Sequence, residues 1–212
     1  RCIQIAWQIH DQSGELMSHE DYLIQPEGFT VPYDAEKIHG ISTELAEKQG
    51  LPLSEVLNLF KIAIGQAEYV GGHNVSFDLN IMGAEFFRLG DSNPLEGTRV
   101  IDTCTEETAT LCQLPGGRGG KFKLPTLTEL YKHLFKTGFG EAHNATADVE
   151  ATTRCFLELL RNGQLNPPAL QDKKEQVVKL QEAQTKTIGL IGLKHLNLKK
   201  ASEALVKNEG VE

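Results

Sequence analysis

Apolar and polar side chains alternate through the first ten residues of the chain. Every second position from Ile3 to Ile9 is apolar, and this period of two predicts a β-strand with one buried face. Residues 11–14 have the composition of a turn, so we expect residues 16–25 to return as the second strand of a hairpin. The chain is thus predicted to open with two antiparallel strands.

In the middle of the chain, short apolar runs typical of strands alternate with segments whose apolar residues have helical spacing. Residues 69–72 and 99–102 are predicted to be short strands. Apolar residues spaced by three and four positions through 79–89 predict an amphipathic helix that ends at Gly90. Before the first of these strands, Ser54 is expected to cap another helix.

Two further helices are predicted from their N-terminal caps. Thr126 and Glu129 have the spacing of a capping box ahead of an apolar run. Asn144 is expected to cap the last helix of the domain, whose apolar face extends to Leu160. Strands at the start, followed by strands that alternate with helices, indicate an α/β fold with a mixed sheet flanked by helices.

The chain is predicted to divide into a domain and a tail. Residues 1–161 form the expected domain, and residues 162–170, which include two adjacent prolines, form a linker. Residues 171–212 have a weak helical period and are expected to form a helical tail. Such a tail docks on a partner protein, packs on the domain as a cap or forms a partly disordered end.

Composition narrows the classes of function. The formal net charge is −8 and the excess acid lies before the tail, which disfavours a protein that coats duplex nucleic acid without sequence preference. Carboxylates that hold divalent cations would reverse this field locally. The four cysteines include no C-x-x-C pair, which disfavours zinc binding and disulfides and favours a reducing cytoplasm. No apolar run is long enough to span a membrane, so no membrane partner is expected.

One stretch of the predicted domain concentrates basic residues. Arg118, Lys121 and Lys123 lie beside glycines, with Phe122 between the two lysines. Because glycine leaves the backbone permissive, these cations are placed to follow a phosphate backbone while Phe122 stacks on a base. An ordinary flexible surface loop is the alternative interpretation.

Two short motifs place polar side chains at the start of a helix. The sequence G-G-H-N-V-S-F-D over 71–78 puts Asp78 just after a strand end, where α/β sheets commonly bind ligands. The sequence H-N-A-T-A-D over 143–148 puts Asp148 in a second helix start. Its histidine and aspartate would diverge by about 140° within one helix, so they converge only if His143 precedes the helix. Taken singly, each motif is also explained by a solvated aspartate that favours the helix dipole.

Taken together and in order, these motifs resemble those of the DEDDh family of 3′→5′ exonucleases, of the kind found in bacterial DNA polymerase III epsilon subunits. Further segments that match the family's pattern also lie in the expected order, and these are residues 3–6, 38–42, 100–103 and 124–130. The resemblance extends from Arg1 to Leu160. It implies an RNase H-like fold and phosphodiester hydrolysis with two divalent ions, Mg²⁺ or Mn²⁺.

The resemblance also assigns roles to individual residues. Asp148 is implied to bind a metal ion directly, and Asp78 to support the second ion directly or through water. His143 is implied to be the general base, since the ordinary pKa of histidine, ~6.5, is close to working pH.

A second group of residues is implied to contact the substrate. His39, Gly40 and Ile41 match the segment that contacts the 3′ end in the family. Asn74 is implied to hydrogen-bond near the terminal nucleotide or to steady its own loop. Phe77 is implied to supply an apolar wall beside Asp78.

The sequence departs from the family's pattern at its beginning. In the family the first strand carries D-x-E, whose two carboxylates bind both metal ions, and no D-x-E lies at or before Ile3. We therefore expect the first, central strand of the sheet to be missing from this chain, and an upstream segment to carry it. Asp78 and Asp148 alone are expected to bind metal weakly.

The resemblance implies a 3′→5′ exonuclease that acts on single-stranded DNA ends. The implied setting is proofreading for a replicative DNA polymerase, with a polymerase subunit as partner. An exonuclease of the same family directed at RNA is one alternative, because no residue pattern shows whether the sugar 2′-OH is read. A catalytically inactive nucleic-acid-binding or scaffold module is the other alternative, which the missing D-x-E favours.

Overall fold

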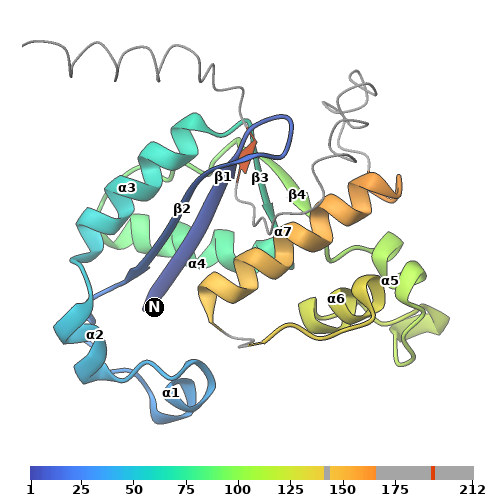
Figure 1. Ribbon diagram of the computed structural model, residues 1–212. Coiled ribbons are helices and arrows are strands. Elements are labelled where there is room, and N and C mark those ends of the chain that lie inside the picture. The colour runs from blue at the N-terminus through green and yellow to red at the C-terminus, as the bar shows by residue number, and fades with distance from the viewer. Residues whose placement is uncertain (141–143, 166–191, 194–212) are drawn as a thin grey trace, which may run out of the picture.

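In the computed structural model, which describes residues 1–140, 144–165 and 192–193, the chain folds around a mixed sheet (Figure 1). In their order across this sheet, the described strands are β2 (Leu16–Leu23), β1 (Gln4–His10), β5 (Gly192–Leu193), β3 (Tyr69–Gly72) and β4 (Arg99–Asp102). β1 and β2 are antiparallel and form the predicted hairpin, whereas β3 and β4 are parallel. The predicted α/β fold with a mixed sheet is therefore confirmed.

Helices cover both faces of the sheet (Figure 1). Within the described residues they are α1 (Tyr33–His39), α2 (Thr43–Gln49), α3 (Leu53–Gln66), α4 (Val75–Arg88), α5 (Glu106–Cys112), α6 (Leu127–Phe135) and α7 (Ala145–Arg161), with one 3₁₀ turn, η1 (Arg118–Gly120). The predicted helix over 79–89 is the greater part of α4, which begins four residues earlier. The capping box predicted ahead of α6 is present, since Thr126 and Glu129 bind each other's backbone N–H groups.

The cap predicted for α3 is wrong. Pro52 occupies the N-cap in place of Ser54, and Leu53 is the first helical residue. The Leu53 N–H donates to a carboxylate that is distant in the sequence, Glu27 Oε1, at 3.2 Å. A tertiary contact thus replaces the local side-chain cap that the sequence pattern predicted.

Three short helices, α1, α2 and α5, have no counterpart among the predictions. Gly40 ends α1 in the left-handed conformation, with φ at 74°, which glycine adopts without a Cβ penalty. Ser42 then caps α2 by accepting a hydrogen bond from the Leu45 N–H at 3.1 Å. α1 buries none of its residues, so no apolar stripe marks it in the sequence.

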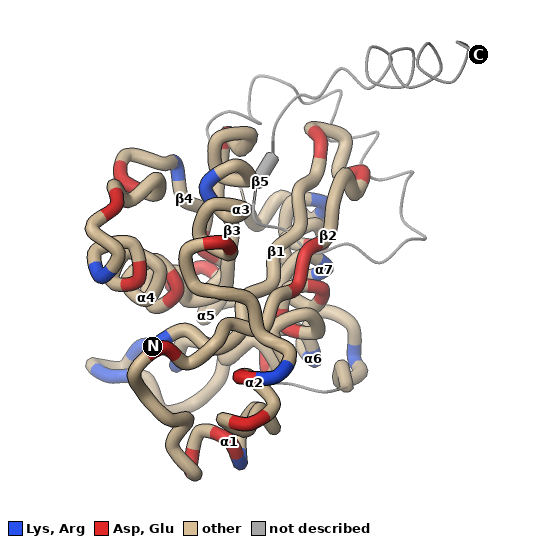
Figure 2. Tube along the Cα trace, turned by 90° about the vertical axis from the view of Figure 1, so that its left-hand side faces the viewer, with Lys and Arg blue, Asp and Glu red and all other residues tan. Residues whose placement is uncertain are grey.

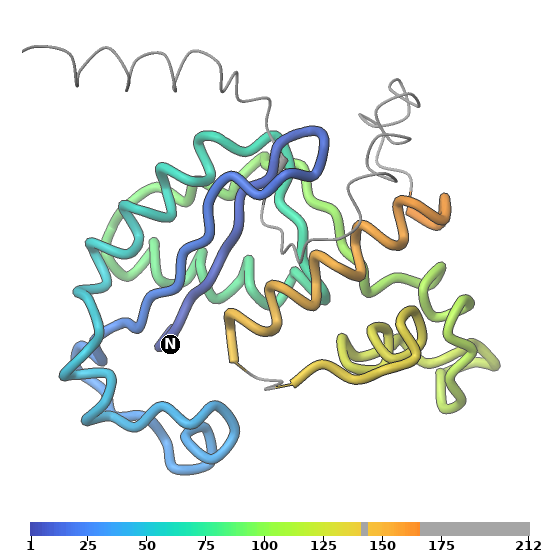
Figure 3. The backbone as a smooth tube through the Cα atoms, viewed as in Figure 1, coloured from blue at the N-terminus to red at the C-terminus, as the bar shows by residue number. Residues whose placement is uncertain are grey.

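The sheet separates two apolar layers. On one face, Ile5, Trp7 and Ile9 of β1 pack against α3 and α4, and the ring centroid of Trp7 lies 5.4 Å from that of Phe60. On the other face, Phe156 of α7 packs against β3 and β4. α6 packs beside α7, and Figure 3 shows α7 running across the sheet with α6 next to it.

The centre of the sheet is held by β5, which has two residues. β5 runs parallel to β1, where it pairs with Ile9 and His10, and antiparallel to β3, where it pairs with Val70. β1 pairs with β2 along its whole length, from Gln4 to His10. Among the described residues, most of β1 therefore has a strand partner on one side only.

The last helix described, α7, ends at Arg161, and the predicted domain boundary at residue 161 stays a prediction. Residues 166–191 and 194–212 lie outside the described residues, so the linker over 162–170 and most of the helical tail over 171–212 stay predictions. Within that tail, residues 192–193 form the strand β5 of the sheet and not part of a helix. All four cysteines are free thiols. None of the described helices is long and apolar enough to cross a membrane.

Glu85 of α4 is a carboxylate enclosed by the domain, with 1% of its surface exposed. Its Oε1 accepts the Cys2 N–H at 2.7 Å. Its Oε2 forms ion pairs with Arg88 at 2.7 Å and with Arg1 at 3.7 Å, although neither contact has hydrogen-bond geometry. These contacts fasten the entry into β1 to α4, and a buried carboxylate depends on such partners.

We expect Glu85→Ala to lower the free energy of unfolding by about 2–3 kcal/mol, because it leaves the Cys2 N–H without an acceptor and two guanidinium groups without a counter-charge. Urea unfolding followed by circular dichroism measures the change. Asp91→Ala is the control, since it breaks an exposed ion pair with Lys61 and should leave the midpoint nearly unchanged. Equal losses in the two variants would contradict the assigned role of Glu85.

Candidate active site

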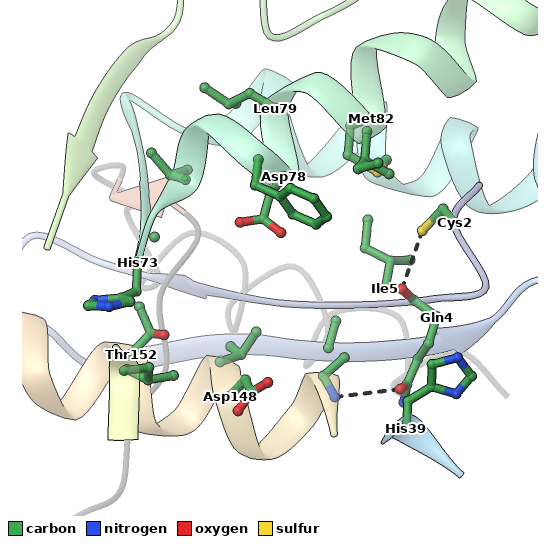
Figure 4. Close-up of a pocket in the computed structure, with 18 of the residues that line it drawn as sticks. Cys2, Gln4, Ile5, His39, His73, Asp78, Leu79, Met82, Asp148 and Thr152 are labelled. Carbon is green, nitrogen blue, oxygen red and sulfur yellow. Dashed lines mark hydrogen bonds between the residues drawn. The ribbon is translucent and has the colours of Figure 1, made fainter. Parts of the chain in front are cut away.

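A cavity of about 780 Å³ lies between α4 and α7 and is bounded by β1 and β3 (Figure 4). Its walls include the apolar side chains of Ile5, Val70, Met82 and Val149. Concave, mainly apolar spaces of this size that contain a few polar groups are the usual form of a ligand site.

Two aspartates from different helices point into this cavity (Figure 4). Asp78 lies in the first turn of α4, and Asp148 lies in the first turn of α7. A carboxylate in the first turn of a helix is favoured by the helix dipole by ~0.3–1 kcal/mol. The fold therefore brings together two sequence motifs that lie far apart in the chain.

The surroundings of Asp78 disfavour its negative charge. The pKa of Asp78 is raised from 3.8 to about 6, chiefly by loss of hydration at the cavity wall and then by the charges of Asp102 and Asp148. Asp78 as a whole residue is nonetheless exposed, so its loss of hydration is partial. Two carboxylates that repel each other across a cavity favour a cation between them.

The start of α7 is fixed by its own cap. The Asn144 side chain accepts hydrogen bonds from the Thr146 and Ala147 N–H groups at 3.1 and 3.3 Å, as the sequence predicted for this position. The Asn144 carbonyl accepts the Asp148 N–H at 2.9 Å. The turn that carries Asp148 is thereby held in helical geometry from its first residue.

A polar network ties this same turn to the hairpin. Gln4 of β1 donates to both carboxylate oxygens of Asp21 in β2, at 3.0 and 3.3 Å. From α7, the Thr146 hydroxyl donates to Oδ2 of the same Asp21 carboxylate. The sequence analysis missed this network, because no local pattern connects residues from two strands and a distant helix.

The start of α4 is held from β4. Asp102, the last residue of β4, accepts the N–H groups of Asn74 at 2.8 Å, Val75 at 3.1 Å and Cys104 at 2.8 Å. Asn74 is left-handed, with φ at 58°, and this turn directs its N–H toward Asp102. The matched segment 100–103 therefore contributes an anchor for the helix start that carries Asp78.

His73 joins three segments beside the cavity. Burial lowers its pKa, so the ring is neutral and carries one N–H. Since the Pro125 carbonyl can only accept, Nε2 donates to it at 2.9 Å. Nδ1 lies 2.9 Å from the Thr103 hydroxyl, which also contacts the Gly72 carbonyl at 3.1 Å. The end of β3 is thus linked to the residue after β4 and to the segment that enters α6.

Of the residues predicted to contact substrate, all but Asn74 line one of two cavities. His39 and Ile41 line the cavity, and Phe77 also lines it while 64% of its surface remains exposed. Gly40 lines a smaller adjoining cavity of about 530 Å³, which His39 and Ile41 share. Asn74 is exposed and is absent from the described residues that line the larger cavity.

At this cavity, the described residues provide two carboxylates, those of Asp78 and Asp148, as ligands for a divalent cation. Among them, no group of three or more His, Cys, Asp or Glu side chains is placed to hold a metal ion. Carboxylate oxygens suit Mg²⁺ or Mn²⁺, but a pair of such ions needs more ligands than Asp78 and Asp148 supply. His143 lies outside the described residues, so its predicted role as general base stays a prediction.

The basic stretch near residue 120 is partly neutralised by acidic neighbours. Lys121 forms an ion pair with Glu106, and Lys123 lies 2.7 Å from Glu129. η1 supplies a turn at Arg118. In the described part of the chain, Figure 2 shows lysine and arginine scattered among acidic residues, without a continuous basic stripe.

Comparison with known sequences gives a match over most of the domain. The family model RNase_T, described as Exonuclease, matches residues 1–156. The DNA polymerase III PolC-type protein of Latilactobacillus sakei subsp. sakei (strain 23K) is 30% identical over 148 residues. That alignment covers 66% of this chain but only 9% of the polymerase.

Solved structures of exonuclease I share this fold. Escherichia coli exonuclease I in complex with a 5cy-dT13 oligonucleotide is 21% identical with a TM-score of 0.60, over 81% of this chain and 38% of that chain. The zinc-ion-bound form of the E. coli exonuclease I–ssDNA complex is 21% identical with a TM-score of 0.56, over 76% and 36% of the respective chains. The fold is therefore RNase H-like, and with the family model matched over more than half of its length, this chain belongs to the DEDDh-type exonuclease family.

Proposed function

We propose that the domain is a 3′→5′ exonuclease that acts on the 3′ ends of single-stranded DNA. The observation that carries this proposal is the meeting of Asp78 and Asp148 in one cavity that His39 and Ile41 also line. Carboxylates here are placed to hold a cation against a substrate phosphate, and the apolar walls are placed to receive a terminal base and sugar.

The relatives support both the substrate and the setting. Exonuclease I of E. coli forms complexes with single-stranded DNA, and the PolC-type relative is a DNA polymerase. On this basis we assign single-stranded DNA as the substrate and proofreading as the setting, with a polymerase subunit as partner. This chain spans 38% of that exonuclease and 9% of that polymerase, so substrate and partner both belong to the proposal.

The chain's own residues take distinct roles in this proposal. Asp148 and Asp78 serve as oxygen ligands for Mg²⁺ or Mn²⁺. His143 accepts the proton of the attacking water, for which its ordinary pKa is suited. Because two carboxylates are too few for two divalent ions, the activity requires further oxygen ligands from outside the described residues.

A nucleic-acid-binding module without catalysis is the second candidate. One observation favours it, namely that the described residues do not complete a metal-binding group. An exonuclease directed at RNA would use the same groups and differ only in reading the 2′-OH. DNA and RNA oligonucleotides of the same sequence, compared as substrates and as ligands, separate these alternatives.

Asp148→Asn and His143→Ala should each lower Mn²⁺-dependent release of mononucleotides by about 10²–10⁴-fold, since they remove a metal ligand and a general base. Release is measured by gel electrophoresis of a 5′-labelled single-stranded oligonucleotide. Glu150→Gln removes one negative charge from the same helix and is the control for Asp148→Asn; its activity should be unchanged. Undiminished release in either site variant would refute the assignment of its residue.

The same experiment separates catalysis from binding. If the unsubstituted chain binds the oligonucleotide at saturating Mn²⁺ but releases no mononucleotide, the binding module replaces the exonuclease as the better account. Paramagnetic resonance of Mn²⁺ adds a readout that does not depend on activity. Asp148→Asn should weaken Mn²⁺ binding, whereas Glu150→Gln should not.

Arg118→Ala should reduce the salt dependence of single-strand binding, because Arg118 is placed to neutralise one phosphate. The slope of log K against log salt should fall by about 0.7–1. Arg161→Ala is the matched control, since it removes the same charge from the far end of α7, where Arg161 pairs with Glu158. Equal slopes for the parent and Arg118→Ala would assign the 118–123 stretch to an ordinary surface loop.

A further inference from the structure

The start of α7 extends beyond the packed part of that helix. Residues 145–150 are half-buried, and the fully buried positions of α7 begin at Ala151. The apolar side chains that pack α7 against the sheet and against α6 lie between Ala151 and Leu160. Asp148 comes before this packed stretch, so its placement depends on polar contacts at the helix start.

Two side chains of the hairpin face this helix start. Because Ile5 packs on the side of α3 and α4, the alternation of a strand directs Gln4 to the opposite face, where α7 lies. Gln4 is paired with Leu23, and Ala6 is paired with Asp21. Gln4 and Asp21 are therefore diagonal neighbours on the face of the hairpin that meets α7.

The hydrogen bonds at this contact all lead to one carboxylate. The Ala145 N–H donates to Gln4 Oε1 at 3.5 Å, which turns the Gln4 amide nitrogen toward Asp21 (Figure 4). That nitrogen donates to both oxygens of Asp21, and the Thr146 hydroxyl donates to Oδ2. Asp21 also brings a negative charge to the N-terminus of α7, where the helix dipole favours it.

Asn144 and Asp21 act on different properties of the turn. Asn144 accepts the N–H groups of residues 146–148, and these bonds lie within the helix start and move with it. The bonds to Gln4 and Asp21 come instead from two strands, so they break when the turn moves relative to the sheet. The cap therefore shapes the turn, whereas Asp21 fixes where it lies.

We propose that Asp21 is a positioning residue for Asp148. Through Thr146 and Gln4 it holds the first turn of α7 against the hairpin, and without it this turn bends away ahead of the packed stretch. The proposal rests on the proposed function in one respect, which is the role of Asp148 as an oxygen ligand. A ligand on a mobile turn binds a cation less tightly, because the cation site is then formed for only part of the time.

Thr146→Val tests the placement of the turn, since it removes the hydroxyl while keeping the shape of the side chain and every charge. Order parameters from ¹⁵N relaxation of the amides of residues 146–148 should fall from about 0.85 to below about 0.6 in Thr146→Val and in Asp21→Asn. Thr146→Ser keeps the hydroxyl and should keep the higher values. Thr110→Val removes a matched hydroxyl from α5, where it bonds to the Glu106 carbonyl, and should change nothing at the start of α7. Unchanged order parameters in Thr146→Val would overturn the proposal.

Mn²⁺ binding, followed by paramagnetic resonance, tests whether this placement serves the ligand. Asp21→Asn and Thr146→Val should each raise the Kd for Mn²⁺ by about three- to tenfold, the range that the loss of one hydrogen bond gives. Because Thr146→Val leaves all charges in place, its effect does not arise from long-range attraction of the cation. The double variant should lose no more than the weaker-binding single variant, since both substitutions break the same contact. Additive losses would contradict a shared contact.

The two measurements separate failure of this proposal from failure of the proposed function. If Asp148→Asn leaves Mn²⁺ binding of the full chain unchanged, Asp148 is not a ligand and the proposed function fails. The order parameters then decide by themselves whether Asp21 positions the turn. If Mn²⁺ binding does need Asp148, a mobile turn in Thr146→Val combined with an unchanged Kd would refute Asp21 as a positioning residue. Recovery of both readouts in Thr146→Ser is the result that supports it.

Discussion

The packing of α7 is the constraint on which the core and the candidate site both depend. Ala151, Cys155 and Leu159 form a buried stripe with the i, i+4 spacing of one helix face, and this stripe packs against α6. Phe156 and Leu160 form a neighbouring stripe that packs against β3 and β4. Because α7 is held on two sides, it cannot rotate about its axis without exposing one stripe. The direction of Asp148 from its first turn is fixed by the same packing.

Local patterns predicted those elements whose stabilising contacts are local. The alternation in β1, the Thr126 capping box and the Asn144 cap each involve residues that are close in the sequence, and the structure contains all three. The cap of α3 was mispredicted because Glu27 binds the Leu53 N–H from outside the helix. α1, α2 and α5 were missed because short helices with few buried residues leave no apolar period.

The candidate site was predictable as a set of residue types but not as a set of positions. Asp78 and Asp148 were found from motifs, and the fold places them in one cavity. The anchors that orient them were not found: Asp102 binds the start of α4, and Asp21 binds the start of α7 through Thr146. Sequence separation hides such anchors, although an aspartate at the end of a strand is a usable signal for the first of them.

The hydrogen bonds of His73 determine which segments around the site move together. Because His73 bonds to both Thr103 and Pro125, the end of β3, the residue after β4 and the entry into α6 form one mechanical unit, to which the turn bearing Asp78 is attached through Asp102. The first turn of α7 is attached instead to the hairpin. The two turns are therefore fixed by different strands, while the body of α7 packs on β3 and β4, so a change in the distance between the two carboxylates requires α7 to bend at its first turn.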